Sequence, residues 1–168
     1  VLEQSFPGDE EVEEFSYVMA AASPDKLRFL EGEEEIWLQP LSDGATVFIS
    51  VFTSREGRDP LAGAKDLLGR ALETGWDEMF RRHSRWWREF WAEGYVELDD
   101  KELEALWYRN LYYLACSSRK GKQCPGLFGN FILLDSSAWH GDYHYNYNVE
   151  QTFWAVYSSN RLQLAEPY

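Results

Sequence analysis

The spacing of apolar residues changes once along this chain, near residue 59, and this change limits the fold more than any other feature. Short runs rich in β-branched and aromatic residues come first, at 15–23, 35–41 and 45–54, and acidic or turn residues separate them. After residue 59, apolar residues recur at helical spacing. Because strand and helix patterns do not alternate, we predict an α+β fold, mainly α, and not a parallel α/β sheet.

The first two predicted helices are separated by a break at 74–77. Asp59 is suited to cap the first helix, and Pro60 suits its first turn. The sequence "ETGWDEMF" indicates that this helix ends and a second one starts. We expect Thr74 to cap the second helix, with Asp77 three residues later.

Two further helices are predicted in the C-terminal half. One begins near 99–100, and its apolar face is expected to include Leu103 and Leu106. The Gly- and Pro-rich segment 117–130 ends it. The last helix is expected to start after Asn148.

Composition is typical of a globular protein and narrows the range of partners. Hydrophobic residues make up 45% of the chain and charged residues 27%. The net charge of −13 repels nucleic acid backbones and anionic lipid surfaces, so we expect neither nucleic acid nor a membrane as partner. Neutral ligands such as sugars are compatible with this net charge. The aromatic content of 17%, with eight tryptophans, suits ring-lined packing or a ring-lined site.

The two cysteines and the chain ends give weaker information. Cys116 and Cys124 are too few for a disulfide scaffold and fit no zinc motif, so we expect ordinary thiols, with a disulfide as the alternative in a secreted protein. The chain starts at Val1 and stops directly after a helical pattern, so we expect a segment of a longer protein. No residue pattern requires a cofactor, and none indicates a compartment.

The stretch from residue 139 to 150 alternates between two kinds of residue. The odd positions are Trp139, Gly141, Tyr143, Tyr145, Tyr147 and Val149. The even positions are His140, Asp142, His144, Asn146, Asn148 and Glu150. If the stretch is extended, the polar groups share one face and the rings share the other. Such a face suits a sugar, which stacks on rings and hydrogen-bonds through its hydroxyls.

Two other interpretations of this stretch stay open. It can be an amphipathic edge whose polar side faces water, with Asn148 only capping the next helix and Gln151 completing the cap. His140, Asp142 and His144 can also be considered as zinc ligands. Because two histidines in a loop lack a fixed ligand spacing, we expect no metal there.

Three segments resemble glycoside hydrolase family 95, which includes α-L-fucosidases and α-L-galactosidases. "YNYNVEQTFWAV" resembles the family's Asn-x-Asn-x-Glu-x-x-(aromatic)-Trp segment, and "CPGLFGNF" resembles its Pro-x-Leu-x-Gly loop. "HSRWWREFW" followed by "VELDD" resembles its linker helix and the start of its barrel. The resemblance implies the end of a β-sandwich over 1–58, a helical linker over 59–98 and the start of an (α/α)6 barrel over 99–168.

The resemblance also implies an inverting glycoside hydrolase that cleaves a terminal neutral sugar. In the family, paired asparagines position the water that attacks the anomeric carbon, and the match assigns this catalytic role to Asn146 and Asn148. Substrate contacts are expected from five other residues: Asp142, His144, Glu150, Trp139 and Trp154. The family's acid and base carboxylates come from helices beyond residue 168, so the segment alone is predicted to be inactive.

Two alternatives to catalysis by this segment follow from the same residues. The rings can bind sugar without chemistry, so a carbohydrate-binding or structural interaction module is the alternative function. An incomplete barrel would also leave apolar helix faces uncovered, such as Trp87–Trp91 and Trp107. Such faces favour self-association.

Overall fold

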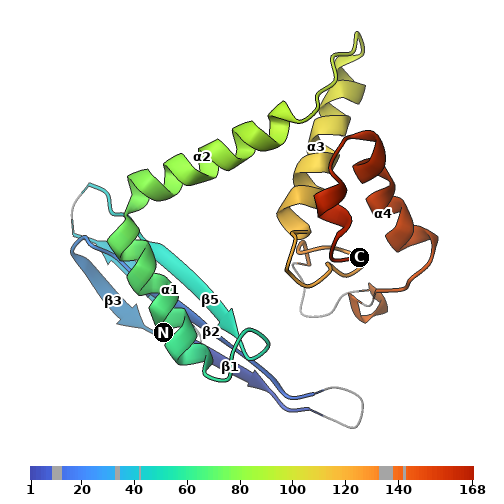
Figure 1. The fold of residues 1–168 in the computed structure, drawn as a ribbon. Helices are drawn as coiled ribbons and strands as arrows, with labels where there is room; N and C mark the ends of the chain where they lie inside the picture. Colours follow the sequence, from blue (N-terminus) through green and yellow to red (C-terminus); the bar gives the residue numbers. More distant parts are fainter. Residues whose placement is uncertain (9–12, 33–34, 42, 133–137, 142) are drawn as a thin grey trace. The chain divides into compact units, whose positions relative to one another are not determined.

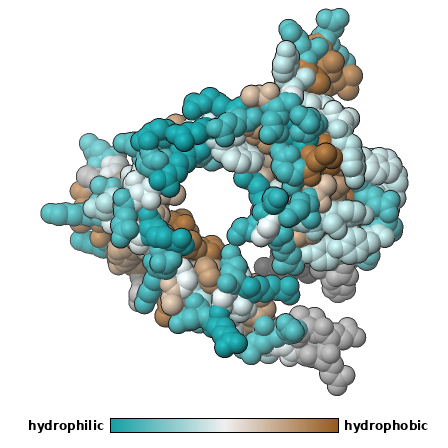
Figure 2. Space-filling model, viewed as in Figure 1, coloured by the Kyte–Doolittle hydropathy of each residue, from teal (hydrophilic) through white to brown (hydrophobic). Residues whose placement is uncertain are grey.

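A computed structural model describes residues 1–8, 13–32, 35–41, 43–132, 138–141 and 143–168 (Figure 1). The chain forms two compact units, Val1–Arg85 and Trp86–Tyr168. Within the described residues strands precede helices, so the predicted α+β class is confirmed. The surface in view is mainly hydrophilic, with hydrophobic residues scattered among the polar ones (Figure 2). This agrees with a net charge of −13.

The first unit contains antiparallel strands. They are β1 (Leu2–Phe6), β2 (Phe15–Ala22), β3 (Leu27–Glu31), β4 (Ile36–Pro40) and β5 (Phe48–Thr53). β1, β2 and β5 form a three-stranded sheet in that order, and β3 pairs with β4 separately. The three strands predicted from the sequence are confirmed as β2, β4 and β5. β1 and β3 were not singled out by the sequence.

Helix α1 (Pro60–Thr74) covers one face of the three-stranded sheet (Figure 1). Val18 and Phe48 from the sheet pack with Ala64 and Leu68 from α1 to form the core of the unit. The predicted cap is confirmed, because the Asp59 carboxylate accepts a hydrogen bond from the Ala62 N–H at 2.9 Å. The helix and sheet therefore form one packed layer pair.

The break between α1 and α2 (Trp76–Ala92) is confirmed, but the predicted cap is wrong. Gly75, with φ 74°, ends α1, and its carbonyl accepts the first helical hydrogen bond of α2 from the Met79 N–H. Thr74 instead donates its hydroxyl to the Arg70 carbonyl at 2.7 Å. A glycine at positive φ thus ends one helix and begins the next, which leaves no role for a threonine cap.

The second unit is built on helices α3 (Lys101–Ser117) and α4 (Tyr147–Ser158), with short 3-10 helices η1 (Ala138–Gly141) and η2 (Leu162–Ala165). Among the described residues, its main buried cluster contains Phe90, Leu114, Ala115, Cys124, Val149, Phe153, Val156 and Leu164. The tryptophans at the end of α2, including Trp87 and Trp91, pack against this core and are half-buried. Cys116 and Cys124 are both free thiols, and burial raises the pKa of the Cys124 thiol.

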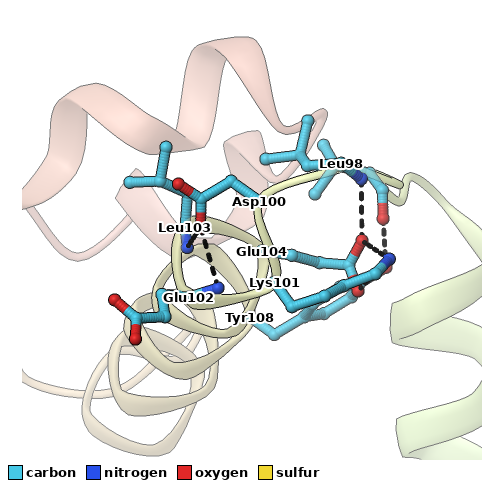
Figure 3. Close-up of polar contacts among 8 residues, drawn as sticks. Leu98, Asp100, Lys101, Glu102, Leu103, Glu104 and Tyr108 are labelled. Carbon is cyan, nitrogen blue, oxygen red and sulfur yellow. Dashed lines mark hydrogen bonds and ion pairs between the residues drawn. The ribbon is translucent and has the colours of Figure 1, made fainter.

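The predicted start of α3 is confirmed by its cap. The Asp100 carboxylate accepts hydrogen bonds from the backbone N–H groups of Glu102 and Leu103 at 3.0 and 3.1 Å (Figure 3). These two donors have no partner within the helix, so the carboxylate satisfies them.

The segment that precedes α3 is held against the first turns of the helix (Figure 3). The Glu104 carboxylate accepts hydrogen bonds from the Leu98 N–H at 2.7 Å and from Lys101 Nζ at 3.1 Å. These donors, the backbone N–H first, lower the pKa of Glu104. The Tyr108 hydroxyl donates to the Val96 carbonyl at 2.9 Å. The approach to α3 is therefore fixed by side-chain bonds to backbone.

The apolar face predicted for α3 is only partly buried. Leu111 and Leu114 are in the core, whereas Leu103 and Leu106 are 55% and 49% exposed. The core residues of the unit lie around the C-terminal half of the helix, where α4 packs. In the part of the chain that the structure describes, the apolar face of α3 is therefore covered over its C-terminal half and uncovered at Leu103 and Leu106.

A buried arginine joins the ends of α2 and α4. Arg161 has no exposed surface, and its guanidinium donates to the carbonyls of Ser159 and, at 2.9 Å, of Gly94. It also lies 4.5 Å from the centre of the Phe90 ring. Gly94 and Ser159 lie one or two residues after the ends of α2 and α4, so one cation bonds the backbone just beyond both helices. Burial lowers the pKa of this guanidinium.

Candidate functional site

The alternating stretch 139–150 is not extended, so the prediction of one polar face is wrong. Residues 138–141 form η1, and α4 already starts at Tyr147. Trp139 and His144 have positive φ angles, 53° and 39°, which turn the chain back on itself. The polar residues make local turns and a cap instead of joining a sheet, as short polar side chains often do.

Asn146 caps α4, so the prediction that Asn148 and Gln151 form the cap is wrong. The Asn146 side chain accepts a hydrogen bond from the Asn148 N–H at 3.4 Å. Its carbonyl accepts from the Val149 and Glu150 N–H groups, both at 3.1 Å. Its φ of −150° is the extended geometry of a cap residue. The helix therefore starts two residues earlier than expected.

The two predicted catalytic side chains lie at the start of α4, Asn146 as its cap residue and Asn148 in its first turn. Asn146 and Asn148 are exposed. Within the described part of the chain, the side chain of Asn148 makes no hydrogen bond, and the Asn146 amide uses only its oxygen. The Asn148 carbonyl accepts from the Thr152 hydroxyl at 3.2 Å. The two amides thus retain donors and acceptors for a ligand or water.

The other predicted site residues form two separate ring contacts. The Trp139 and His144 rings meet edge to face with centres 5.3 Å apart. Trp154 meets Tyr147 edge to face at 5.5 Å. Glu150 is exposed on α4. The pKa of Tyr168 is raised, mainly by burial of the Tyr168 hydroxyl and next by the negative charge of Glu150. Asp142 and the side chain of His140 lie outside the described residues.

Histidine, cysteine and carboxylate groups do not converge in the part of the chain that the structure describes. No three such residues lie where they could hold a metal ion there. Of the three residues considered as zinc ligands, Asp142 and the side chain of His140 are outside this part. The prediction of no metal therefore stays a prediction.

A pocket of about 430 Å³ is lined in part by Gln151 and Thr152, three and four residues after Asn148 in α4. Its walls come from the C-terminal half of α3, the loop 125–131 and α4. The lining residues are Asn110, Tyr113, Leu114, Ser117, Pro125, Gly126, Leu127, Phe128, Gly129, Phe131, Gln151, Thr152 and Ala155. This pocket could not be predicted from the residue pattern, because its walls are far apart along the chain. Of the pocket walls, the sequence indicated only the loop, through its Gly- and Pro-rich composition.

Gly129 allows the pocket loop to lie against α3. It has φ 59°, and a Cβ there would be 2.9 Å from the Ser117 Oγ. The preceding part of the loop is tied to the α4 side, since the Tyr143 hydroxyl donates to the Cys124 carbonyl at 2.7 Å. The positive φ of Gly129 and the hydrogen bond from Tyr143 to Cys124 thus hold the pocket wall in place.

Comparison with known proteins decides the family. The sequence model described as "Glycosyl hydrolase family 95 catalytic domain" matches residues 82–168, which is more than half of the chain. The chain belongs to glycosyl hydrolase family 95. The resemblance found in the sequence is therefore confirmed, and the matched part of this family 95 chain contains the asparagine pair and the pocket.

Three curated proteins are similar to this family 95 chain over short segments. Maltose phosphorylase from Bacillus subtilis (strain 168) is 37% identical over 70 residues, covering 40% of the chain and 9% of that protein. Probable alpha-fucosidase A from Aspergillus niger is 41% identical over 56 residues, covering 33% and 7%. Nigerose phosphorylase from Lachnoclostridium phytofermentans is 33% identical over 73 residues, covering 42% and 10%.

The matched segments span at most a tenth of the length of these relatives. In the described part of the family 95 chain, no helix has the length and apolarity needed to cross a membrane.

Proposed function

We propose that this chain belongs to an inverting glycoside hydrolase that cleaves a terminal neutral sugar, and that Asn146 and Asn148 hold the attacking water. The observation that carries the proposal is the position of the pair. Both amides are exposed, one at the cap and one in the first turn of α4, within the part that matches a glycosyl hydrolase catalytic domain. The carbohydrate substrate follows from the same family.

An amide pair performs only part of this reaction. A side-chain amide oxygen accepts a hydrogen bond from water and orients it, but it is too weak a base to remove the proton alone. Inversion requires a general acid at the leaving oxygen and a base-side carboxylate on the opposite face of the sugar. We place both carboxylates outside these 168 residues, so the segment alone is inactive.

Five residues around the pair are proposed to contact the substrate. His144, Glu150, Trp139 and Trp154 are exposed, which leaves them accessible to a ligand. Rings suit the C–H face of a sugar, and the carboxylate suits its hydroxyls. Asp142 is retained in this set from the sequence.

We also propose the division into a sandwich end over 1–58, a linker over 59–98 and a barrel start over 99–168. The three-stranded sheet supports the assignment of residues 1–58 to the end of a sandwich. Ile49 and Val51, 64% and 47% exposed, lie on the sheet face opposite to the one that α1 covers. A sheet that is apolar on both faces is normally covered on both.

The test of the catalytic role uses the full-length protein. Asn146→Ala and Asn148→Ala should each lower kcat on a chromogenic glycoside of a neutral sugar by about a hundredfold or more, as expected when a positioned reactant is lost. NMR of the first product should show the inverted anomer. Unchanged turnover in both variants would mean that the amides do not hold the water.

Phosphorolysis is a second candidate reaction, because two of the similar proteins are named phosphorylases. Among the residues that the structure describes, no charged side chain lines the pocket beside α4 to bind phosphate, which favours water as the acceptor. Turnover of the full-length protein with and without inorganic phosphate separates the two reactions. Formation of a sugar phosphate product would show that the reaction is phosphorolysis and not hydrolysis.

Self-association through helix faces stays a proposal, with different residues from those first expected. Trp87, Trp91 and Trp107 are only half-buried or packed on other rings, whereas Leu103 and Leu106 are exposed. Light scattering of the 168-residue chain at increasing concentration measures this directly. A constant monomer mass would contradict it.

A further inference from the structure

We infer that the pocket between α3, the loop 125–131 and α4 is a binding subsite for one neutral saccharide unit, with the amides of Asn110 and Gln151 as its polar contacts. This inference rests on the proposed function and adds to it a recognition site. The family match covers the pocket but assigns no role to either amide.

The size of the pocket fits a small organic ligand. Its volume of about 430 Å³ lies within the range of roughly 300–1,000 Å³ that is usual for small-molecule sites. It is lined by rings as well as polar groups. Phe128 and Phe131 are both exposed, and Phe131 meets Tyr113 edge to face at 5.2 Å. Such rings offer flat faces to the C–H side of a sugar.

The absence of charge determines the class of ligand. Thirteen of the residues that the structure describes line the pocket, and none of these has a charged side chain. A phosphate, a carboxylate or an amine in this pocket would lose hydration without meeting an opposite charge, which is costly. A neutral molecule with many hydroxyl groups has no such cost, because hydroxyls exchange water for amide and hydroxyl partners.

The hydrogen bonds of the lining residues leave two amides available. The hydroxyls of Ser117 and Thr152 already donate to backbone carbonyls of their own helices, at 3.0 and 3.2 Å. The side chains of Asn110 and Gln151 make no hydrogen bond with any described residue. One amide comes from α3 and the other from α4, so they lie on walls contributed by different helices. Each can donate and accept, as sugar hydroxyls also do.

The pocket adjoins the proposed catalytic pair through the periodicity of α4. Gln151 is three residues after Asn148, and Thr152 is four, so these side chains are neighbours along one side of the helix. The Thr152 hydroxyl bond to the Asn148 carbonyl fixes this neighbourhood. A sugar unit in the pocket would therefore lie next to the water that the asparagines hold, and Gln151 would help to select it.

The test measures sugar binding and turnover separately in the full-length protein. Asn110→Leu and Gln151→Leu each remove one amide at nearly constant size, and Gln39→Leu, at an exposed position on β4, is the matched control. Binding of L-fucose, D-galactose and D-glucose is followed by saturation-transfer NMR. For the sugar that binds, each pocket variant should weaken the dissociation constant by about three- to tenfold, as expected for one lost neutral hydrogen bond. The control should bind as the unaltered protein does.

Asn146→Ala separates this inference from the proposed function. If it loses turnover but still binds the sugar, and the pocket variants bind weakly, both proposals stand. If the pocket variants bind sugar like Gln39→Leu, the subsite is refuted while the catalytic role of Asn146 is unaffected. If Asn146→Ala keeps full turnover while the pocket variants lose binding, the subsite stands and the catalytic role fails. Tighter binding of the corresponding sugar phosphate would refute the neutral class of ligand.

Discussion

Substitution of Asn146 separates the two roles that the structure and the family give to this residue. The side chain caps α4 through the Asn148 N–H, and it is also a proposed holder of the attacking water. Asn146→Ala removes both functions. Asn146→Asp keeps the cap, because aspartate and asparagine are about equally good at this position, but it removes the amide N–H donors and adds a negative charge.

The effect on stability is set by the cap. Replacing a capping asparagine with alanine costs about 0.5–2 kcal/mol of unfolding free energy. The cap bond of Asn146 is long, at 3.4 Å, so we expect the lower part of this range. Asn146→Asp should leave the free energy of unfolding close to that of the unaltered protein. Chemical denaturation measures both changes.

The effect on activity should not follow the effect on stability. Both variants should lose about a hundredfold or more in kcat, although only Asn146→Ala is destabilised. Asn148→Ala is the control, since its side chain has no capping bond: it should lose turnover without a loss of stability. If Asn146→Asp keeps full turnover and Asn146→Ala loses it only in proportion to unfolding, Asn146 is a helix cap and nothing more.

Three further predictions concern stability. Gly63→Ala should destabilise the first unit by about 1–3 kcal/mol, since the added Cβ would be 2.6 Å from the Phe52 ring. Gly69→Ala should stabilise the unit by about 0.5–1 kcal/mol, because the added Cβ would meet no atom within 4 Å. Thermal unfolding measures both changes. Arg161→Met should cost about 1–3 kcal/mol in denaturant unfolding because it leaves helix-end carbonyls without a donor, and an unchanged midpoint would contradict this. Glu104 has a lowered pKa, so its contribution is complete above its ordinary value of 4.5 and is lost as the pH falls below it. Glu104→Gln should therefore make the fall in stability below pH 4.5 less steep.

The helix boundaries that the sequence predicted correctly depend on local chemistry. Asp59 and Asp100 each precede a helical run, and each carboxylate reaches backbone N–H groups only two or three residues ahead. Such a bond needs no distant partner, so it can be read from a few neighbouring residues. The predicted cap at Thr74 was wrong because Gly75 ends the preceding helix at positive φ and takes the position of the cap.

The alternating stretch shows how a period of two can occur without a strand. The pattern predicts two faces only if every residue has extended angles, and Trp139 and His144 do not. Asn146 then competes for backbone donors and starts a helix. The resemblance to the family was still confirmed, over residues 82–168, because it depends on residue order and not on the conformation of the stretch.

The pocket could not be predicted from the sequence because it depends on long-range packing. Asn110 and Gln151 are 41 positions apart, and nothing local links them. Their positions follow from the contact of α3 with α4 around Leu114 and Phe153. Gly129, whose positive φ lets the loop lie on Ser117, was visible only as part of a Gly-rich segment.

The packing of α4 explains how one short helix and its cap can present both the proposed catalytic pair and a pocket wall. Val149, Phe153 and Val156 are buried in the core, which fixes the rotation of the helix about its axis. Asn148 precedes Val149 in the chain and Gln151 follows it by two positions, so burial of this apolar stripe directs both amides away from the core. Functional side chains on a helix are held more accurately than side chains on a loop, because the buried stripe determines their direction. A substitution that loosens the stripe, such as Phe153→Ala, should therefore disturb sugar binding and turnover together, unlike any single change at the amides themselves.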